Sequence, residues 1–487
     1  QRGRVDRHQT LSDAVAWSYE LLEPECQELF VDLSVFAGSF DRDDAAGVLE
    51  RLGSTTDELS AHLADLVDHS MVAADHSGDR TRYRLLETLR HFAHDLAGDE
   101  RLTQLRDAHA AWVRDLVARL DDELFGDDEL SAVVEFDRHY AELRAAHAHA
   151  LESGDLDTAT EIVVDTEEYA LYRLRDETVA WGFATLDDPA IAEHPRLAEV
   201  LGCAAQGLAY RGELEQARAM AERAVAIGGE LDVRSGWALR ALSNINLYEG
   251  NLEESTRLAR LEREIPDADH RRAEINAGVI EVLCLAYSGR HEQAEEAARM
   301  HLARAEDRGS PNYLSWSHFV LAESLVDDPE TALVHLGTAR RIAASLDAKF
   351  VVGVVSVAIG SIQVRLGRLD DALDTFAQII VNWRRWGDWT HQWTTLRHVV
   401  GVLIEIGHPT EAARLLGAVR NPRTGARPYG SDDDLLDAQA ARLRAQLGEE
   451  RFRSLAAEGR DADADLLVAD VTGAIDQARR ARTERGG

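Results

Sequence analysis

The sequence predicts a mainly all-α protein in which a small domain of helices and one β-hairpin is followed by an α-solenoid. Three observations predict this fold. Apolar residues recur at helical spacing through most of the 487 residues, two short alternating segments flank Ser77-Gly78-Asp79, and a short signature recurs every 38 to 40 residues from Gly212 onward. A hydrophobic fraction of 45% is enough to bury a core and argues against general disorder.

The first hundred residues predict four helices and a hairpin. A helix capped by Thr10 comes first, a second starts at Pro24, a third begins near Asp43, and a fourth follows Thr56. The segments 71–75 and 80–86 then alternate apolar and polar residues as short strands do. Helices followed by a hairpin are the pattern of a winged helix, which we assign to residues 1–97.

Charge argues against DNA recognition by this domain. A winged helix that reads DNA lays its last helix in the major groove and uses basic and amide side chains there. Residues 55–70 carry four acidic residues and neither Arg nor Lys, and the whole chain has a net charge of −35. We therefore expect no direct binding of nucleic acid by this chain. The alternative, a transcription factor that binds DNA through its own wing, requires binding that weakens steeply with salt.

The rest of the chain predicts helices almost throughout. Two long helices, 102–120 and 129–151, separated by an acidic loop, connect the domains within residues 98–152. Helical repeats follow in 153–420. A linker rich in Pro, Gly and Arg begins the last part, 421–487, whose helices we expect to cap the array.

The repeats are recognised by a Gly, or an Asp in one copy, followed five positions later by a small residue. Such a pattern predicts a helix, a tight turn and a second helix that approaches the first closely. Pairs of this kind resemble tetratricopeptide repeats, and HEAT-like pairs of about 40 residues are the alternative. A weaker copy precedes the first at Arg175 and Ala180, and Gly154 with Ala159 is out of register. The main copies are Gly212/Ala217, Gly250/Ser255, Gly289/Ala294, Asp327/Ala332, Gly367/Ala372 and Gly407/Ala412.

Several separated motifs carry a resemblance to a protein family. TLSDAVAWSYELLEPECQELFVDLSVFAGSF, LADLVDHSMV, YRLLETLRHFA, AARLLGAVR and GEERFRSLAAEGR occur in this order. They resemble the part that follows the nucleotide-binding core in bacterial STAND-class (NB-ARC-like) ATPase transcriptional regulators of the LuxR-type, SARP-type and cyclase-linked kinds.

The resemblance implies a function. In that family the winged helix packs on an upstream nucleotide-binding domain that holds ATP or ADP, and the repeats sense an effector. It implies that Trp17, Arg84, Glu87 and Arg90 lie at this interdomain interface. Leu86 stands where relatives place a histidine, so a histidine contact to a phosphate is lost here, whereas Glu87 keeps the acidic position.

Catalytic motifs are missing from the sequence. A P-loop requires Lys after Gly, and the only lysine is Lys349, in AKF. We therefore predict no catalytic residues, no cofactor and no enzyme activity in this chain, with any ATPase activity lying upstream. His91 and His94 lie three apart on a predicted helix, but a metal site lacks a third ligand, and we expect no metal.

Four tryptophans fall close together around Gly387. They are candidates, with two arginines, for a ligand pocket or a protein-binding patch. The alternative is that large aromatic residues at helical spacing wedge one repeat against the next. The six candidates are Trp383, Arg384, Arg385, Trp386, Trp389 and Trp393.

These observations together predict the sensor portion of a signalling ATPase that controls transcription. Its expected partners are a protein or small-molecule effector on the repeats and the upstream nucleotide-binding domain, with no membrane. Three cysteines without a CxxC motif and the absence of a signal peptide predict a cytoplasmic location. The chain begins at Gln1 rather than Met, so we expect a fragment or a processed form. The alternative function is a free-standing protein-binding scaffold.

Overall fold

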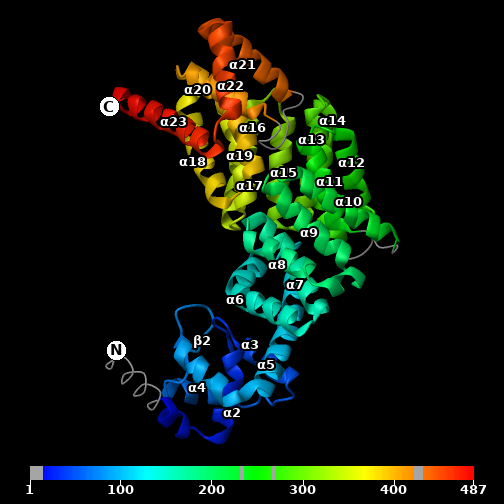
Figure 1. Ribbon diagram of the computed structural model, residues 1–487, viewed down its shortest axis with the longest axis vertical. Coiled ribbons are helices and arrows are strands. Elements are labelled where there is room, and N and C mark those ends of the chain that lie inside the picture. The colour runs from blue at the N-terminus through cyan, green and yellow to red at the C-terminus, as the bar shows by residue number, and fades with distance from the viewer. Residues whose placement is uncertain (1–14, 231–234, 266–268, 422–430, 487) are drawn as a thin grey trace. The chain divides into compact units, whose positions relative to one another are not determined.

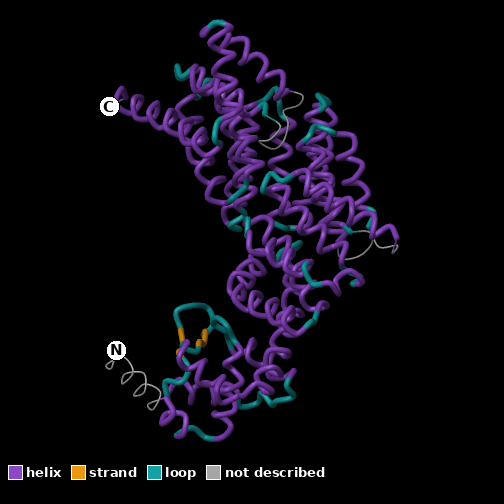
Figure 2. Tube along the Cα trace, in the orientation of Figure 1, coloured by secondary structure: helices purple, strands orange, loops and turns teal. Residues whose placement is uncertain are grey.

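The computed structural model describes residues 15–230, 235–265, 269–421 and 431–486. Nearly all of this chain is helical, and one small sheet lies near the N-terminus (Figure 2). The chain divides into two compact units. The first comprises residues 1–121, 131–166 and 188–191, and the second comprises 122–130, 167–187 and 192–487.

The N-terminal part has the predicted winged-helix order, helices and then a hairpin (Figure 1). The helix expected to start at Thr10 is described only from residue 15, so its N-cap lies outside the described residues. The elements are α2 (Pro24–Asp32), the 3-10 helix η1 (Leu33–Val35), α3 (Arg42–Arg51), α4 (Leu59–Asp68), β1 (Ala73–Asp75), β2 (Arg82–Arg84), α5 (Glu87–Glu123), α6 (Glu129–Ser153) and α7 (Leu156–Arg173).

The hairpin is antiparallel and shorter than the sequence predicts. Ala74 pairs with Tyr83, and Tyr83 also forms a bridge with Phe40. Met71 and Val72 were expected in the first strand, but their amide N–H groups bond the carbonyl oxygen of Leu66 and finish the turn after α4. The strand therefore begins at Ala73.

The two helices expected around residue 97 form one long element. In α5 the helix that follows the hairpin continues into the predicted 102–120 helix, and Gly98 kinks it with a φ of 67°. Glycine adopts this left-handed conformation without steric cost, so the chain bends there without a loop.

The second unit is built from helix pairs. Their bounds are α8 (Asp176–Leu186), the 3-10 helix η2 (Pro189–Glu193), α9 (Leu197–Tyr210), α10 (Leu214–Glu230), α11 (Gly236–Tyr248), α12 (Leu252–Arg263), α13 (Asp269–Tyr287), α14 (His291–Arg308), α15 (Pro311–Ser324), α16 (Pro329–Ser345), α17 (Lys349–Arg365), α18 (Leu369–Trp386), α19 (Trp389–Glu405), α20 (Pro409–Val419), α21 (Ser431–Leu447), α22 (Glu449–Asp461) and α23 (Ala464–Gly486). The protein is thus a winged helix followed by a TPR-like α-solenoid, as predicted.

The repeat signature marks the turn inside each pair. The five signature glycines adopt φ between 71° and 83°, and the small residue five positions later is fully buried in every main copy. A side chain at these turn positions would be strained, and a larger residue at the buried position would push the paired helices apart.

The predicted weaker copy is out of register by one residue. Leu174, not Arg175, has the left-handed backbone, with φ 52°, and lies 38 residues before Gly212. The buried partner position is Val179, whereas Ala180 is exposed. This copy is hard to recognise in the sequence because its turn has Leu174 in place of glycine and its buried position has Val179 in place of a small residue.

The first helices of the pairs form a closed ring. Each of α9, α11, α13, α15, α17 and α19 packs against the next, and α19 packs back against α9. The Thr390 hydroxyl on α19 donates a 2.6 Å hydrogen bond to the carbonyl oxygen of Ala209 on α9. The Arg173 guanidinium adds a 2.7 Å bond to the carbonyl oxygen of Leu346. The array therefore encloses a central space instead of presenting an open groove.

Among the described residues, the helices lack the combination of length and apolar content that crossing a bilayer requires. The apolar segment 350–364 lies within α17, one of the six ring helices, and much of it is buried.

Candidate functional site

The ring of inner helices surrounds a cavity of about 470 Å³, which we call the central cavity. This volume lies in the range of small-molecule sites, about 300 to 1,000 Å³. Apolar and aromatic side chains form most of its wall. The residues that the site depends on are Tyr172, Tyr210, Arg240, Asn244, Tyr248, Asn276, Tyr287, Trp316, Phe319, Glu323, Phe350, Val354, Val357, Arg365, His391, Arg397 and His398.

The buried end of the cavity, its floor, is an aromatic cluster. The rings of Tyr210, Phe350 and His391 lie with centroids 4.9 to 5.8 Å apart, and Trp316 lies 5.9 Å from Phe350. All four side chains are less than 9% exposed. Such rings offer flat apolar surfaces against which a planar molecule stacks.

A buried ion pair adjoins the floor. The guanidinium of Arg240 donates to the Glu168 carboxylate at 2.6 Å and to the Tyr172 hydroxyl at 3.4 Å, and it lies over the ring of Trp237. Arg272 is also within 3.3 Å of Glu168. Two arginines therefore share one carboxylate in a region that is almost fully removed from solvent.

Two further carboxyl groups lie in the same buried region. Burial raises the pKa of Glu262 to about 8, although Arg240 nearby and a 2.6 Å bond from the Asn276 amide lower it. Burial and the charge of Glu168 raise the pKa of Glu167 to about 8 as well. Both groups are mostly protonated at pH 7, so this buried region carries an excess of positive charge.

The other end of the cavity, its mouth, is more exposed. Arg365 is exposed there, and Tyr287, Glu323 and His398 are half-buried. The hydroxyl of Tyr287 donates to Glu323 at 3.3 Å. The cavity thus has an apolar, aromatic interior and a polar mouth, an arrangement typical of binding sites for small amphipathic molecules.

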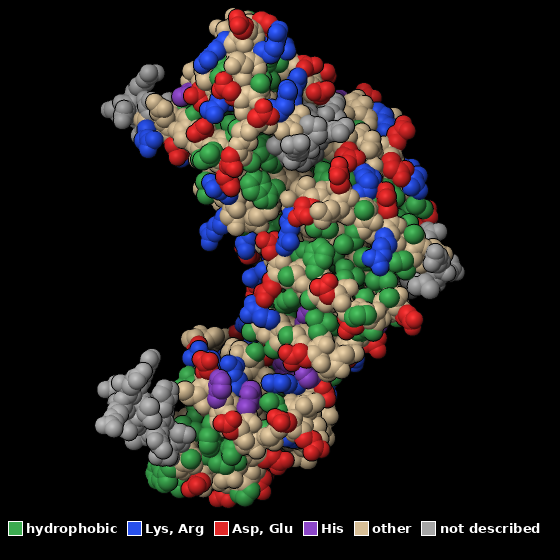
Figure 3. Space-filling view, in the orientation of Figure 1, with side chains coloured by type: hydrophobic (Ala, Val, Ile, Leu, Met, Phe, Trp, Pro, Cys, Tyr) green, Lys and Arg blue, Asp and Glu red, His purple; other side chains and the backbone are tan. Residues whose placement is uncertain are grey.

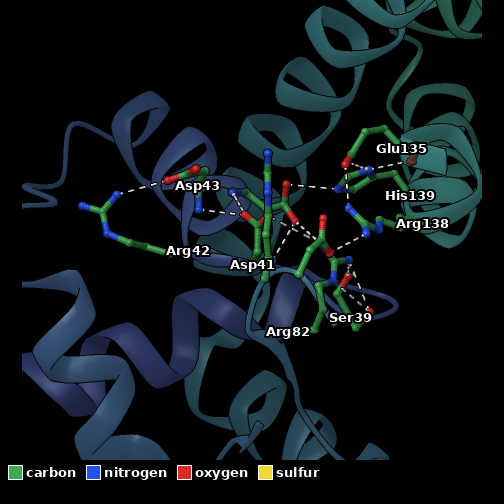
Figure 4. Close-up of polar contacts among 11 residues, drawn as sticks. Ser39, Asp41, Arg42, Asp43, Arg82, Glu135, Arg138 and His139 are labelled. Atoms are coloured by element: carbon green, nitrogen blue, oxygen red, sulfur yellow. Dashed lines mark hydrogen bonds and ion pairs between the residues drawn. The ribbon is translucent and has the colours of Figure 1, made fainter. Parts of the chain in front are cut away.

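A second polar network lies in the first unit and fixes the winged helix to α6. Figure 4 shows Arg82 of the hairpin beside Asp41 and Ser39, with Glu135, Arg138 and His139 of α6 facing them. His139 contacts Asp44 at 3.0 Å, Arg82 donates to Asp44 at 3.0 Å, and Arg138 donates to Asp79 at 2.8 Å. Burial lowers the pKa of His139, but the hydrogen bond and charge of Asp44 outweigh it and leave the pKa raised.

Glu142 of α6 forms a second attachment to the winged helix, at the segment that joins η1 to α3. Its carboxylate accepts the backbone N–H groups of Ala37 and Gly38 at 2.9 and 2.6 Å, and His109 of α5 lies 2.9 Å from it. Glu142 is only 1% exposed. The winged helix is therefore attached to α5 and α6 by buried, charge-assisted hydrogen bonds.

The surface of the winged helix that would face DNA is not basic. The exposed positions of α4 include Ser60, Ala64, Asp65 and Asp68. In the hairpin, Arg80 is paired with Asp41 at 3.2 Å. Figure 3 shows acidic and basic side chains interspersed on the visible face of the chain.

The six residues predicted around Gly387 do not line the central cavity. Trp383 is fully buried, and its indole N–H donates to the Thr395 hydroxyl at 2.9 Å. Trp393 is 4% exposed, while Trp386 and Trp389 are half-buried. Arg384 and Arg385 are exposed, and Arg384 pairs with Asp465. A binding role for these six residues stays a prediction.

The predicted interdomain residues lie on the winged helix. Trp17 is 65% exposed and the neighbouring apolar residue Leu86 is 50% exposed. Arg84 and Glu87 are also exposed. Arg90 instead donates to the carbonyl oxygen of Ala37 at 2.8 Å. Exposed large apolar side chains are available for contact with another domain, whereas Arg90 has a role within this one.

The side chains of His91 and His94 contact two different backbone carbonyl groups. The His91 ring nitrogen Nδ1 contacts the Glu87 carbonyl oxygen, and His94 Nε2 contacts that of Ser34. Over the described part of the chain, we find no cluster of three or more His, Cys, Asp or Glu side chains suited to a metal ion.

Sequence reasoning missed the central cavity. Its lining comes from eight helices spread over more than 200 residues, and each aromatic residue alone is typical of a helix core. The signal that could have revealed the cavity is the presence of polar residues at core positions. Arg240, Asn244 and Asn276 interrupt otherwise apolar faces of α11 and α13. A buried arginine among apolar residues indicates either a structural ion pair or a ligand site.

Known proteins resemble parts of this chain. Residues 22–97 match the family described as "Winged helix-turn-helix domain". A protein of Mycobacterium tuberculosis (strain ATCC 25618 / H37Rv) named as a "Putative HTH-type transcriptional regulator" is 35% identical over 191 residues, which are 38% of this chain and 21% of that protein. The match thus spans about a fifth of the relative's length.

Two further similarities were found. An uncharacterized protein of the same strain is 35% identical over 94 residues, which are 18% of this chain and 23% of that protein. A solved structure from Pyrococcus horikoshii, a signal transduction ATPase with numerous domains (STAND) and a tetratricopeptide repeat sensor, aligns with a TM-score of 0.42 and 14% identity. The alignment covers 88% of this chain and 66% of that one. The N-terminal region is thus a winged helix, and regulator homologues share part of the sequence.

Proposed function

We propose that this chain is the sensor portion of a STAND-type signalling ATPase that controls transcription. The helical repeats bind an effector in the central cavity, and the winged helix relays the bound state to a nucleotide-binding domain that precedes Gln1. The observation that carries the proposal is the closed ring of inner helices around a cavity with an aromatic floor and a polar mouth.

The regulator homologues support a role in transcription, and the N-terminal motifs support attachment to an upstream domain. Exposed Trp17 and Leu86 provide apolar surface for such a contact. ATP or ADP would be held by the upstream domain, since the described site contains no phosphate-binding loop. The chain itself supplies no catalytic group in this proposal.

The winged helix acts on a protein domain, not on DNA, in this account. An exposed α4 face with aspartates repels phosphates, and Arg80 and Arg82 of the hairpin are paired with carboxylates. The test is binding of a fluorescent 30-base-pair duplex at 50 and 200 mM NaCl. We expect no binding at either concentration. Binding that weakens by a factor of about ten or more between them would contradict this part of the proposal.

Reading the natural gene upstream of the codon for Gln1 tests the sensor assignment. A preceding segment of a few hundred residues with GxxxxGK[ST] is the expected result. A start codon at or near Gln1 would overturn it and favour a free-standing scaffold, for which the closed ring leaves the outer helices as the binding surface.

A further inference from the structure

The central cavity has features that select among effectors, and the following inference rests on the proposed function. The first feature is closure. TPR-like arrays that bind peptides need an open concave groove for an extended chain, but here α19 packs on α9 and the Thr390 hydroxyl bonds the Ala209 carbonyl oxygen. The space inside therefore accommodates a compact molecule better than a polypeptide segment.

The second feature is the aromatic floor. Trp316 and Phe350 lie side by side with Tyr210 and Tyr172, and each of the four side chains is at least nine-tenths buried. The adjoining wall is aliphatic, with Val354 and Val357 partly exposed to the hollow. Flat rings and aliphatic walls favour a planar, largely apolar body.

The third feature is an unsatisfied donor. The indole N–H of Trp316 is buried and has no hydrogen-bond partner, although Trp316 lines the cavity and is only 8% exposed. Leaving such a group unpaired is unfavourable, because the donor has lost its bond to water without gaining another. A bound molecule with an acceptor atom near the indole would satisfy it.

The fourth feature is charge. In a chain with a net charge of −35, the charged residues that line this cavity are three arginines, 240, 365 and 397, and one glutamate. The carboxylate of Glu168 serves both Arg240 and Arg272, and the described bonds of Arg240 use two of its five N–H donors. An anionic group on the ligand would balance the excess positive charge.

We propose that the central cavity binds a small aromatic acid, a planar apolar molecule bearing one anionic group, and that this class contains the natural effector. Aromatic rings stack on the floor beside Trp316 and Phe350, and the acid group lies toward the arginines. Peptides and uncharged or cationic aromatic molecules bind more weakly.

The test uses a pair of probes with the same ring skeleton. 8-Anilinonaphthalene-1-sulfonate is an aromatic anion with a flat naphthalene ring system, and its fluorescence rises in apolar surroundings. N-phenyl-1-naphthylamine lacks only its sulfonate. With the whole chain, we expect saturable binding of one anilinonaphthalenesulfonate per chain and at least tenfold weaker binding of the uncharged compound. Equal or tighter binding of the uncharged compound would overturn the anionic part of the proposal.

Three variants locate the probe. Val357→Trp fills the hollow from a partly exposed position and should reduce the bound fluorescence to less than a tenth. Trp316→Phe keeps an aromatic ring but removes the N–H donor, so affinity should fall about fivefold. Val334→Trp, at an exposed position of α16 outside the cavity, is the matched control and should bind within twofold of the unchanged chain.

Wild-type-like binding by Val357→Trp, with an unchanged circular dichroism spectrum, would place the probe elsewhere and overturn the proposal. If Val357→Trp fails to fold, Val354→Trp takes its place, and the probe comparison on the unchanged chain still decides the charge requirement. Probe binding in the cavity without any role in transcription would contradict the proposed function and the effector assignment, but not the inference that the cavity binds aromatic acids.

Discussion

The hydroxyl of Thr390 and the carbonyl oxygen of Ala209, 181 residues apart in the sequence, are joined by a buried hydrogen bond of 2.6 Å. This bond connects the last ring helix, α19, to the first, α9. It turns a row of similar helix pairs into a ring with an interior. The interior, more than any single repeat, forms the cavity in which we propose that a ligand binds.

Thr390→Val should weaken the ring closure. The valine keeps the shape but loses the hydroxyl, and the free energy of unfolding should fall by about 1 kcal/mol. Urea unfolding followed by circular dichroism measures the change. Thr394→Val is the control, because its hydroxyl bonds only the Thr390 carbonyl oxygen within α19, and an equal loss there would show that closure has no special role.

Arg240→Met should destabilise the array strongly. It removes the guanidinium that donates to the buried Glu168 carboxylate at 2.6 Å, and breaking a buried pair costs about 3 to 5 kcal/mol. The matched change is Arg257→Met, which removes an exposed pair with Glu254 and should cost less than about 1 kcal/mol. Similar losses of unfolding free energy for the two variants would contradict the account of the buried network.

Glu142→Ala should loosen the winged helix from α5 and α6. The backbone N–H groups of Ala37 and Gly38 lose their acceptor, and His109 loses its carboxylate, at a cost of about 3 kcal/mol. Hydrogen exchange by mass spectrometry should show faster exchange in the peptide that contains residues 37 and 38. Glu152→Ala, an exposed residue of α6, should leave that peptide unchanged.

Stability should fall as pH rises from about 4.5 to 8. The pKa of Glu262 is about 8 in the folded chain against an ordinary value of 4.5, so the folded state binds the extra proton throughout this range. The stability it contributes is full below pH 4.5 and is lost by about pH 8. Glu262→Gln should reduce the slope by up to about 1.4 kcal/mol per pH unit, leaving the contributions of the other buried carboxyl groups, Glu167 and Glu129.

Chemical denaturation at several pH values gives that slope. Glu253→Gln, an exposed residue of the same helix, α12, should keep the slope of the unchanged chain. A slope that is the same in Glu262→Gln as in the unchanged chain would mean that Glu262 is ionised in the folded state.

The fold could be predicted because its signals are local. A glycine with positive φ and a buried small residue five positions later recur at Gly250 and Ser255 as at Gly212 and Ala217, so each turn is visible within a few residues. The exception, Leu174, shows the limit: a strained non-glycine turn gives no local signal. The hairpin was predicted as well, but the helix-ending bonds of Met71 and Val72 shorten it.

The cavity could not be predicted because it depends on closure. Tyr210 on α9 meets Phe350 and His391 only when α19 returns to α9, and nothing within one repeat encodes that contact. The tryptophans around Gly387 were conspicuous because they are close in sequence. Trp383 and Trp393 lie in the core of the array. The aromatic residues of the cavity instead come from several helices that are far apart in the sequence.

The central claim, that the cavity controls a regulator of transcription, is tested most directly in the organism that carries the natural gene. Transcripts are compared among the parent strain, a deletion of the gene, and chromosomal Val357→Trp and Val334→Trp variants with equal protein abundance. We predict that deletion changes a defined set of transcripts, that Val357→Trp changes the same set, and that Val334→Trp does not. A Val357→Trp strain identical to its parent, or a deletion without effect on any transcript, would contradict the account.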